Sequence, residues 1–485
     1  MANLLLYNAV NQGIFSKAED NPVNLGLFSI SAFAKEKGYS VKLLKNIKFI
    51  DIDKDLKHDL KDALLVGVSC MTGDPIKNAI QFSKTLKKIA PELKIVWGGY
   101  HASLEPDQTL SNSYIDFLIR GWGEEPIVEL LNAIKHNRDY TNIKGLSYKQ
   151  DGKIIHNPTA RYDDIGKFPM YDYKLLDGFK EQVKGRGFIY CSSRGCPFNC
   201  SFCSVAAFYE GNKPYYSYSL ERIFDELQYF QKEFKPSHFF LWDDNFFVDK
   251  KRVHDFCEIY KQKKCDFKWE SFGRCDFFSN CDESLLALLK EVNLKKIYFG
   301  AESGSLAVLK KINKNITPAQ ILSSLERIKK YGIIGDYTFM SGFPFESLAD
   351  LKETLKLMKD LQGIDSSAGI RIFNFSPSPK MDLIKDCLKA GFKYPVKIEE
   401  WEKFEYHCFV PNWVSPEHAR LLKVLPWLTS FLSQETLPYK EKRGIVDFVL
   451  KILHKSSKFR FKHDFYLFPV EWLALRFFYK KHLGI

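Results

Sequence analysis

The chain has 485 residues, of which 45% are hydrophobic and 15% aromatic, so it can bury sizeable cores in two to four domains and is not a disordered protein. No apolar run approaches the roughly 18–20 residues that cross a bilayer, and no signal peptide is recognised. The 11 cysteines are an odd number, which a fully paired secreted protein would not have. We therefore expect a soluble, cytoplasmic chain. The net charge is +12, but residues 440–485 hold eleven Lys or Arg against four Asp or Glu, which argues against a general nucleic-acid surface and for a local anionic partner.

Residues 1–140 alternate short apolar runs with amphipathic stretches. The runs lie at residues 4–7, 41–44, 64–68, 95–99 and 117–120, and helical patterns such as residues 76–89 lie between them. This alternation predicts a doubly wound, flavodoxin- or Rossmann-like α/β domain with a parallel sheet and helices on both faces. Ligands of such sheets bind at the carboxyl ends of the strands, near the switch point of the strand order.

Small and polar residues follow three of these predicted strands. The segments are Ser-Cys-Met-Thr-Gly at 69–73, Gly-Gly-Tyr-His-Ala-Ser at 98–103 and Gly-Trp-Gly-Glu-Glu at 121–125. Glycines at strand ends let a flat ligand approach the backbone closely, although any one of them could simply form a turn. Three such segments in register favour a ligand site, and its candidate residues are Ser69, Thr72, Gly98, Gly99, His101, Gly121, Gly123 and Glu124.

This half of the chain resembles the cobalamin-binding domain that precedes many radical S-adenosylmethionine domains. The Gly-Gly-x-His-Ala-Ser and Gly-x-Gly-Glu segments carry most of the resemblance. The Asp-x-His-x-x-Gly motif, whose His replaces the lower ligand of cobalt, is absent, and residues 11–26 contain no His. The resemblance therefore implies either a variant that binds cobalamin without this His or a domain that has lost the cofactor. His101 is a candidate ligand, with a packing or loop role as the alternative.

A polar connector is expected over residues 141–185, with Pro158 and Pro169 as breakers, and β/α units resume over 186–379. Six apolar runs predict strands at residues 187–191, 238–242, 268–272, 296–300, 336–340 and 369–373. In barrels built from β/α units, the chemistry takes place at the carboxyl ends of the strands.

Three cysteines follow the first of these strands in the spacing Cys-x3-Cys-x2-Cys, namely Cys196, Cys200 and Cys203. Three thiolates can bind three irons of a cubane cluster and leave the fourth iron open for a further ligand. Zinc is an alternative, but structural zinc sites usually have two Cys-x2-Cys pairs well apart, and no second pair is present. Cys191 falls outside the spacing and is expected to be a buried strand residue.

This spacing, with Phe202 before the last Cys, resembles the signature of the radical S-adenosylmethionine enzymes. The resemblance implies a [4Fe-4S] cluster whose open iron chelates S-adenosylmethionine, and a 5′-deoxyadenosyl radical made when the cluster donates an electron. It also implies a partial (β/α)6 barrel, a need for low oxygen, and an electron donor such as flavodoxin or ferredoxin.

Polar segments after the later strands resemble those with which this family binds S-adenosylmethionine. The resemblance implies that Asp-Asp-Asn at 243–245 accepts hydrogen bonds from the methionyl ammonium and that the arginine at 274 pairs with its carboxylate. Glu-Ser at 302–303 would lie near the amino group or ribose, and Gly-Phe-Pro-Phe-Glu at 342–346 near adenine. Each segment alone could be a solvated turn, and the order after successive strands favours the site. The candidate residues are Asp243, Asp244, Asn245, Arg274, Glu302, Ser303 and Gly342.

Residues 380–485 read as a helical, basic C-terminal region. Apolar residues recur at helical spacing from Ile445 to Leu453, with lysines nearby, and an aromatic stretch follows over residues 465–478. Basic helices with an aromatic apolar face can lie on anionic membranes. The alternative is that the apolar stripe packs on the barrel and the lysines face water.

Together these patterns predict a cobalamin-associated radical S-adenosylmethionine enzyme that acts on a small-molecule, lipid-like or natural-product substrate and not on nucleic acid. The favoured reaction is methylation of an unactivated carbon. One S-adenosylmethionine would recharge methylcobalamin, and another would give the radical that abstracts the substrate hydrogen. The alternatives are a cyclisation or rearrangement with the same cofactors, and a sensor that binds cobalamin and a cluster without turnover.

Overall fold

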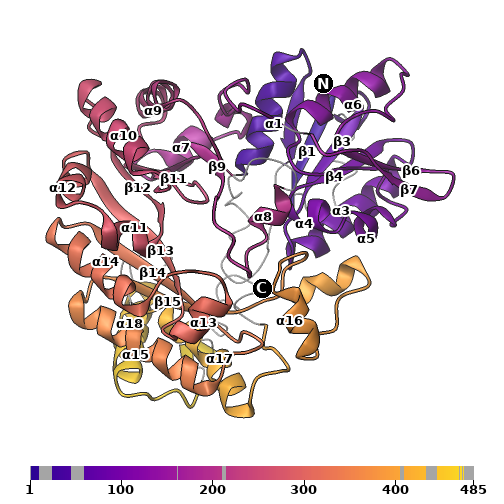
Figure 1. Ribbon diagram of the computed structural model, residues 1–485. Coiled ribbons are helices and arrows are strands. Elements are labelled where there is room, and N and C mark those ends of the chain that lie inside the picture. Colours follow the sequence, from indigo (N-terminus) through magenta and orange to yellow (C-terminus); the bar gives the residue numbers. More distant parts are fainter. Residues whose placement is uncertain are drawn as a thin grey trace.

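The computed structural model describes residues 2–9, 24–44, 59–160, 162–209, 215–404, 409–432, 445–468, 470–471 and 473–474. Two sheets dominate the fold, one from the N-terminal third of the chain and one from its middle (Figure 1). Helices cover both faces of the first sheet and the outside of the second, so the predicted α/β class is confirmed.

The first sheet has the strand order β2-β1-β3-β4-β5-β6-β7. The five predicted strands are confirmed as parallel neighbours: β1 (Leu4–Asn8), β2 (Val41–Leu44), β3 (Leu65–Ser69), β4 (Lys94–Gly98) and β5 (Phe117–Ile119). The strands are apolar throughout because both faces are covered. On β1, Leu4 and Leu6 belong to one buried cluster, whereas Leu5 and Tyr7 belong to another.

Helices α1 (Leu25–Glu36) and α6 (Glu124–Lys135) supply buried residues to the first of these clusters, and α3 (Pro75–Ile89) supplies the second. Two short helices, α4 (Tyr100–Leu104) and α5 (Pro106–Leu110), follow β4. Chain order reverses between β1 and β3, so the switch point lies at the carboxyl ends of these two strands.

An antiparallel hairpin of β6 (Leu146–Gln150) and β7 (Lys153–His156) extends this sheet at the β5 edge. It lies within residues 141–185, where the sequence indicates only a polar connector. The turn is Asp151-Gly152, and both residues have positive φ, of 50° and 74°. An Asp-Gly pair in this conformation is a strong hairpin signal, which the polar composition of the segment obscures.

The second sheet contains the six predicted strands, all parallel and in sequence order: β8 (Gly187–Tyr190), β11 (His238–Leu241), β12 (Lys268–Gly273), β13 (Leu294–Glu302), β14 (Ile334–Ser341) and β15 (Gly369–Asn374). Since β8 and β15 are its two edges, the sheet forms a partial barrel. Its outer layer consists of α9 (Leu220–Phe234), α10 (Lys250–Gln262), α12 (Glu283–Glu291), α14 (Pro318–Lys330) and α15 (Leu348–Ile364).

The segment after β8 leaves the barrel and meets the first domain. Strands β9 (Ser193–Gly195) and β10 (Tyr215–Ser217) pair antiparallel, and α8 (Val205–Phe208) contacts α4 of the N-terminal domain (Figure 1). The predicted cysteine motif lies between β9 and α8, so it is held where the two domains touch.

The described part of the C-terminal region consists of helices joined by irregular segments. It comprises α16 (Ile384–Lys389), η2 (Ile398–Lys403), α17 (Pro416–Thr429) and α18 (Ile445–Lys462). Helix α17 contacts β15, α18 contacts α17, and η2 contacts α3, where Trp401 is fully buried in the second N-terminal cluster. Within the described ranges, no helix is long and apolar enough to span a bilayer.

Candidate functional site

A cavity of about 720 Å³ lies between the two domains. One wall is formed by the carboxyl ends of β1, β3, β4 and β5, and the opposite wall by β8, β9, α8 and the residues after β11. A volume of this size suits a large organic cofactor. The predicted strand-end residues on its wall are Ser69, Gly98, Gly99, Gly121, Gly123 and Glu124.

The glycines keep the cavity floor open. Gly99 has φ +88°, and an added Cβ would come 3.0 Å from the Cys70 carbonyl oxygen, so no larger residue fits there without strain. A Cβ on Gly123 would lie 2.9 Å from Ile30 Cδ1, whereas one on Gly98 would meet only the Ile119 oxygen, at 3.7 Å. Side chains at these positions would therefore disturb the floor or fill the cavity.

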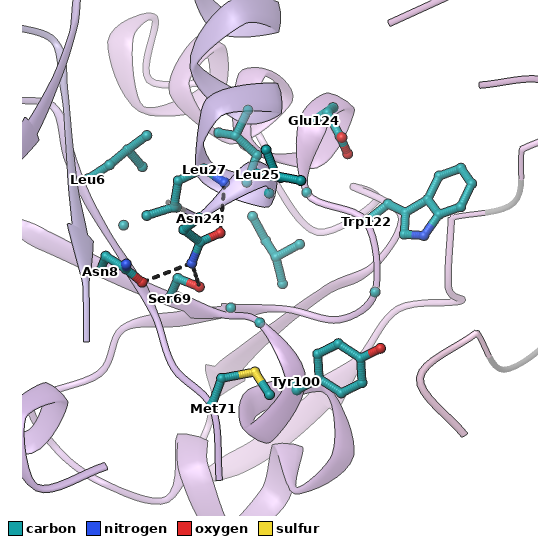
Figure 2. A pocket seen from close by; sticks show the side chains of 18 of the residues that line it. Leu6, Asn8, Asn24, Leu25, Leu27, Ser69, Met71, Tyr100, Trp122 and Glu124 are labelled. Carbon is teal, nitrogen blue, oxygen red and sulfur yellow. Dashed lines mark hydrogen bonds between the residues drawn. The ribbon is translucent and has the colours of Figure 1, made fainter. Parts of the chain in front are cut away.

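A polar cluster lies at the switch point on the same floor (Figure 2). Asn24 Nδ2 donates to Asn8 Oδ1 at 2.8 Å and to Ser69 Oγ at 3.1 Å, while Asn24 Oδ1 accepts from Leu27 N at 3.1 Å and caps α1. Apolar side chains surround it, among them Leu6, Leu25, Leu27, Ile30, Val96 and Ile127. A slot of apolar walls with a few amide and hydroxyl groups fits the flat ring and amide side chains of a cobalamin. The sequence gives Asn24 only a helix-cap signal.

Thr72 and His101 do not line the cavity. His101 is fully buried, its Nδ1 lies 3.1 Å from Thr72 Oγ1, and its ring meets Trp401 edge-on at 6.1 Å. Burial lowers the pKa of His101 to about 3, so the ring is neutral. These contacts support the packing role, and the candidate role of His101 and Thr72 in cofactor binding has no geometric support.

Glu124 forms a buried ion pair with Arg194, a residue that sequence reasoning missed. Arg194 Nη2 lies 2.7 Å from Glu124 Oε1 and donates to Ser29 Oγ at 3.0 Å, and Ser29 Oγ donates to Glu124 Oε1 at 2.6 Å. The guanidinium also lies 5.0 Å from the centre of the Trp122 ring. Burial alone would raise the pKa of Glu124, but the pairing with Arg194 outweighs it and lowers that pKa. Since Arg194 precedes Cys196 by two residues, this pair joins the cysteine loop to the N-terminal domain.

Cys196, Cys200 and Cys203 are partly exposed on one loop. Cys203 N donates to the Cys200 oxygen at 3.0 Å, and Ser201 N donates to the Ile312 oxygen at 2.9 Å, which ties the loop to the barrel. Burial raises the pKa of Cys196 and that of Cys203, the latter to about 11, and the neighbouring thiols add to both shifts. The thiols therefore lie close enough to interact, and bound iron would be needed to hold them ionised.

Across the described residues, no three His, Cys, Asp or Glu side chains converge as they would around a single ion. A cubane cluster does not require such convergence, because each cysteine binds a different iron. A loop that presents three thiols and no fourth donor therefore fits a cluster with one open iron.

Arg274, the predicted partner of the methionyl carboxylate, lies beside this loop. Its guanidinium is 3.8 Å from the centre of the Phe198 ring, and Nη1 is 3.9 Å from Cys200 Sγ. Its Nε donates to Asp276 at 3.0 Å and Nη2 to the Lys314 oxygen at 2.7 Å, so the side chain is fixed in place. Asp276 already occupies part of the fork that was expected to bind a methionyl carboxylate.

Glu302 pairs with Lys314 at 2.8 Å, and both side chains are 8% exposed. Glu302 ends β13 with φ +64°, a conformation that turns its carboxylate toward this lysine. The structure thus brings Glu302 and Arg274 together near the cysteine loop. It adds Lys314, which follows α13 (Leu306–Lys311) and which the sequence did not indicate as a site residue.

The three residues after β11 have different environments. Asp243 is fully buried and accepts from Ser192 N at 2.6 Å and from the hydroxyls of Ser192 and Ser193, so its acceptors are used within the protein. Asp244 accepts from Gly195 N at 2.9 Å and lines the cavity. Asn245 is buried, and neither its Oδ1 nor its Nδ2 has a partner among the described residues. Asn245 is therefore better suited than Asp243 to contact a ligand.

Ser303 and the turn at Gly342 have structural partners. Ser303 Oγ lies 3.1 Å from Thr354 Oγ1 and accepts from Ser305 N at 3.1 Å. Gly342 has φ +101°, and the backbone N–H groups of Gly342 and Phe343 both donate to Glu346. Burial raises the pKa of Glu346 to about 7.

Tyr100 connects the cavity floor with the cysteine loop. Its ring stacks on Phe208 of α8 at 4.3 Å and 15°. Burial, followed by the nearby Asp244, Cys203 and Cys191, raises the pKa of Tyr100. Tyr100, Asp244 and Cys191 line the cavity, as do Arg194 before the cysteine loop and Phe208 after it. None of Cys196, Cys200 and Cys203 lines it, so the loop adjoins the cavity through the segments at its two ends (Figure 2 shows Tyr100 in the cavity wall).

Comparison with known proteins agrees with this geometry. Residues 190–358 match the Radical SAM superfamily, and residues 12–131 match the B12 binding domain. An uncharacterized methyltransferase of Pyrococcus horikoshii is 32% identical over 344 residues, which are 70% of this chain and 73% of the relative. The anaerobic magnesium-protoporphyrin IX monomethyl ester cyclase of Rubrivivax gelatinosus is 25% identical over 459 residues, covering 90% of this chain and 79% of the cyclase.

Among solved structures, the radical S-adenosylmethionine methyltransferase TsrM from Kitasatospora setae superimposes with a TM-score of 0.70 at 15% identity, covering 93% of this chain and 99% of TsrM. The matching family models confirm the predicted enzyme class and its cofactors, namely cobalamin for the first domain and a [4Fe-4S] cluster with S-adenosylmethionine for the second. The chain belongs to the radical S-adenosylmethionine enzymes that carry a cobalamin-binding domain.

Proposed function

We propose that this enzyme transfers a methyl group to an unactivated carbon of a small, apolar molecule. The observation that carries the proposal is the cavity between the two domains, which is lined by Arg194 and Phe208 on either side of the cysteine loop and by Tyr100 and Asp244. The name of the Pyrococcus relative, a methyltransferase, supports the same reaction. When bound, the cluster with S-adenosylmethionine supplies hydrogen abstraction, and cobalamin supplies the methyl group.

The residues of this chain would bind, orient and shield these groups. The three cysteines would hold the cluster, and Asn245 would offer its unpartnered amide to S-adenosylmethionine. Arg274, Glu302 and Lys314 would hold charged groups in fixed positions next to the cluster, since all three side chains are buried. A buried setting excludes water and strengthens such interactions.

Aromatic side chains on the barrel support an apolar substrate, whether lipid-like or another natural product. Phe240, Phe272 and Tyr298 are half-buried on neighbouring strands, and their rings lie 5.0–5.5 Å apart. Trp242 continues this group to the cavity wall and is 47% exposed. Exposed rings of this kind offer a flat, apolar contact surface. Flavodoxin or ferredoxin would supply the electron.

Cyclisation or rearrangement with the same cofactors is a second candidate. It is favoured by the relative from Rubrivivax gelatinosus, a cyclase that aligns with 90% of this chain.

Anaerobic reconstitution with iron, sulfide and hydroxocobalamin tests the proposal. We expect a cobalamin spectrum and, with reductant and S-adenosylmethionine, both 5′-deoxyadenosine and S-adenosylhomocysteine. Cys196→Ala is expected to abolish 5′-deoxyadenosine formation, while Cys265→Ala, a partly exposed cysteine outside the loop, is the matched control. Formation of 5′-deoxyadenosine without S-adenosylhomocysteine or a methylated product would favour the second candidate.

A further inference from the structure

Among the described residues, helix α18 has one buried face and one face with exposed apolar side chains. Helix α18 contacts α17. The buried residues of α18 form its inner face: Leu450, Leu453, His454, Ser457, Arg460 and Phe461. These positions recur every three or four residues, as expected for one side of a helix. The inner face therefore matches the packing alternative drawn from the sequence, but it accounts for only part of the apolar residues.

The outer face is exposed and apolar. Phe448 is 66% exposed, Ile452 51% and Phe459 63%, and their spacing of four and seven residues places them in one stripe opposite the buried side. Five more exposed apolar residues follow the helix: Phe465, Leu467, Phe468, Val470 and Leu473. We call Phe448, Ile452 and Phe459 the tail face. The segment after the helix turns to the other side, because Ser457 and Arg460 of the buried face donate to Glu471 and Arg460 donates to the Phe468 oxygen. The tail face and this segment together hold eight of the sixteen large hydrophobic residues that are exposed in the described chain, which is far from an even scatter.

Lysines border the stripe on one side. Lys455, Lys458 and Lys462 are exposed, at positions that lie next to the apolar stripe on the helix surface. Two acids after the helix have partners of their own, since Asp464 pairs with Lys359 at 2.6 Å and Glu471 is buried against Arg460. The tail face is thus apolar and positively charged at its edge.

We propose that the tail face docks on an anionic lipid bilayer surface. Interfacial helices combine bulky apolar residues on one side with Lys or Arg beside them, and the lysines meet lipid headgroups. A protein partner would need an acidic rim of its own to meet lysines of a single sign, whereas an anionic bilayer supplies that charge throughout its surface. The inference does not depend on the reaction proposed above, because none of these residues lines the cofactor cavity.

Sedimentation of the full-length protein with vesicles tests it. We compare phosphatidylcholine vesicles with vesicles that also contain phosphatidylglycerol. At about 1 kcal/mol, or roughly fivefold, per lysine near an anionic surface, the three lysines predict a preference on the order of a hundredfold for the anionic vesicles at low salt. Added salt should reduce this preference.

Two sets of substitutions separate the contributions. The triple variant Phe448→Ser, Ile452→Ser, Phe459→Ser should lose about tenfold or more of the binding to anionic vesicles. The variant Lys455→Gln, Lys458→Gln, Lys462→Gln should bind both vesicle types equally and weakly. The matched control Leu388→Ser, Val396→Ser removes apolar residues that are 47% and 76% exposed elsewhere, and should bind like the native protein. Circular dichroism and iron content verify the fold of each variant.

Three results would overturn the proposal. The native protein could stay in the supernatant with both vesicle types, or the serine variant could bind as the native protein does. A native dimer that the serine variant converts to a monomer, without vesicle binding, would assign the tail face to contact between two copies.

Discussion

The buried pair Arg194–Glu124 makes a quantitative prediction about how the two domains hold together. In Arg194→Gln, the Glu124 carboxylate, whose side chain is 3% exposed, loses its cation and keeps the hydroxyl of Ser29 and its own backbone N–H as donors. Removing one partner of a buried ion pair costs about 3–5 kcal/mol. For a unit of 150–250 residues, where 1 kcal/mol shifts the melting temperature by about 2–4 °C, the variant should melt roughly 6–20 °C lower.

The same variant should change the pH dependence of stability. In the native protein Arg194 lowers the pKa of Glu124 below its value in the unfolded chain. The pair therefore stabilises the fold at pH values above the unfolded-state pKa, and this stabilisation is lost as pH falls through the folded-state pKa. Without Arg194, burial remains and raises the pKa of Glu124 in the folded state. Stability would then fall as pH rises through that raised value, which is the opposite sign.

Thermal melting of the cofactor-free protein, recorded at several pH values for Arg194→Gln, Glu124→Gln and the double variant, measures the coupling between the two residues. We expect each single variant to be destabilised and the double variant to recover part of the loss, because it leaves no unpaired charge. Titration with hydroxocobalamin, followed by absorbance, should show weaker binding for each single variant. Single variants that melt within about a degree of the native protein at every pH would refute the reasoning.

Two further outcomes can be stated. Gly99→Ala forces a Cβ to within 3.0 Å of the Cys70 oxygen at φ +88°, so its affinity for cobalamin should fall by at least about tenfold. The control Gly363→Ala, whose Cβ would meet nothing within 4 Å, should bind cobalamin normally. Titration of both variants with hydroxocobalamin measures the difference. Glu346 has a pKa raised to about 7 by burial, so it contributes stability below the unfolded pKa that is lost as pH rises through about 7, and Glu346→Gln should flatten this part of the melting profile. Equal slopes for the native protein and the Glu346 variant between pH 5 and 8 would contradict that assignment.

The parallel strands and the cysteine loop could be predicted because their signals are local. Strands such as β3 and β4 are short apolar runs covered on both faces, and the three cysteines are close in sequence. The need for glycine at Gly99 could also be predicted, since its positive φ belongs to the turn after a strand. In each case the neighbours in the chain decide the outcome.

The remaining site residues depend on contacts between distant segments. Arg194 meets Glu124 across 70 positions of sequence, and Tyr100 meets Phe208 across the domain boundary. The adjacent acids Asp243 and Asp244 look alike in sequence, yet one is turned to the serines after β8 and the other to the cavity. His101 was a candidate ligand because it follows a strand, with packing as the alternative, and the ring of Trp401 from the C-terminal region packs against it.

The cavity whose two walls belong to different domains has a consequence for assembly. A ligand bound by both walls stabilises the docked arrangement of the domains in proportion to its occupancy, by RT ln(1 + [L]/Kd). Helix α8, which follows the cysteine loop, meets the N-terminal domain at the same contact, where Phe208 stacks on Tyr100. Loading the cavity would therefore also hold the end of the cysteine loop in place, so that one cofactor orders the site of another.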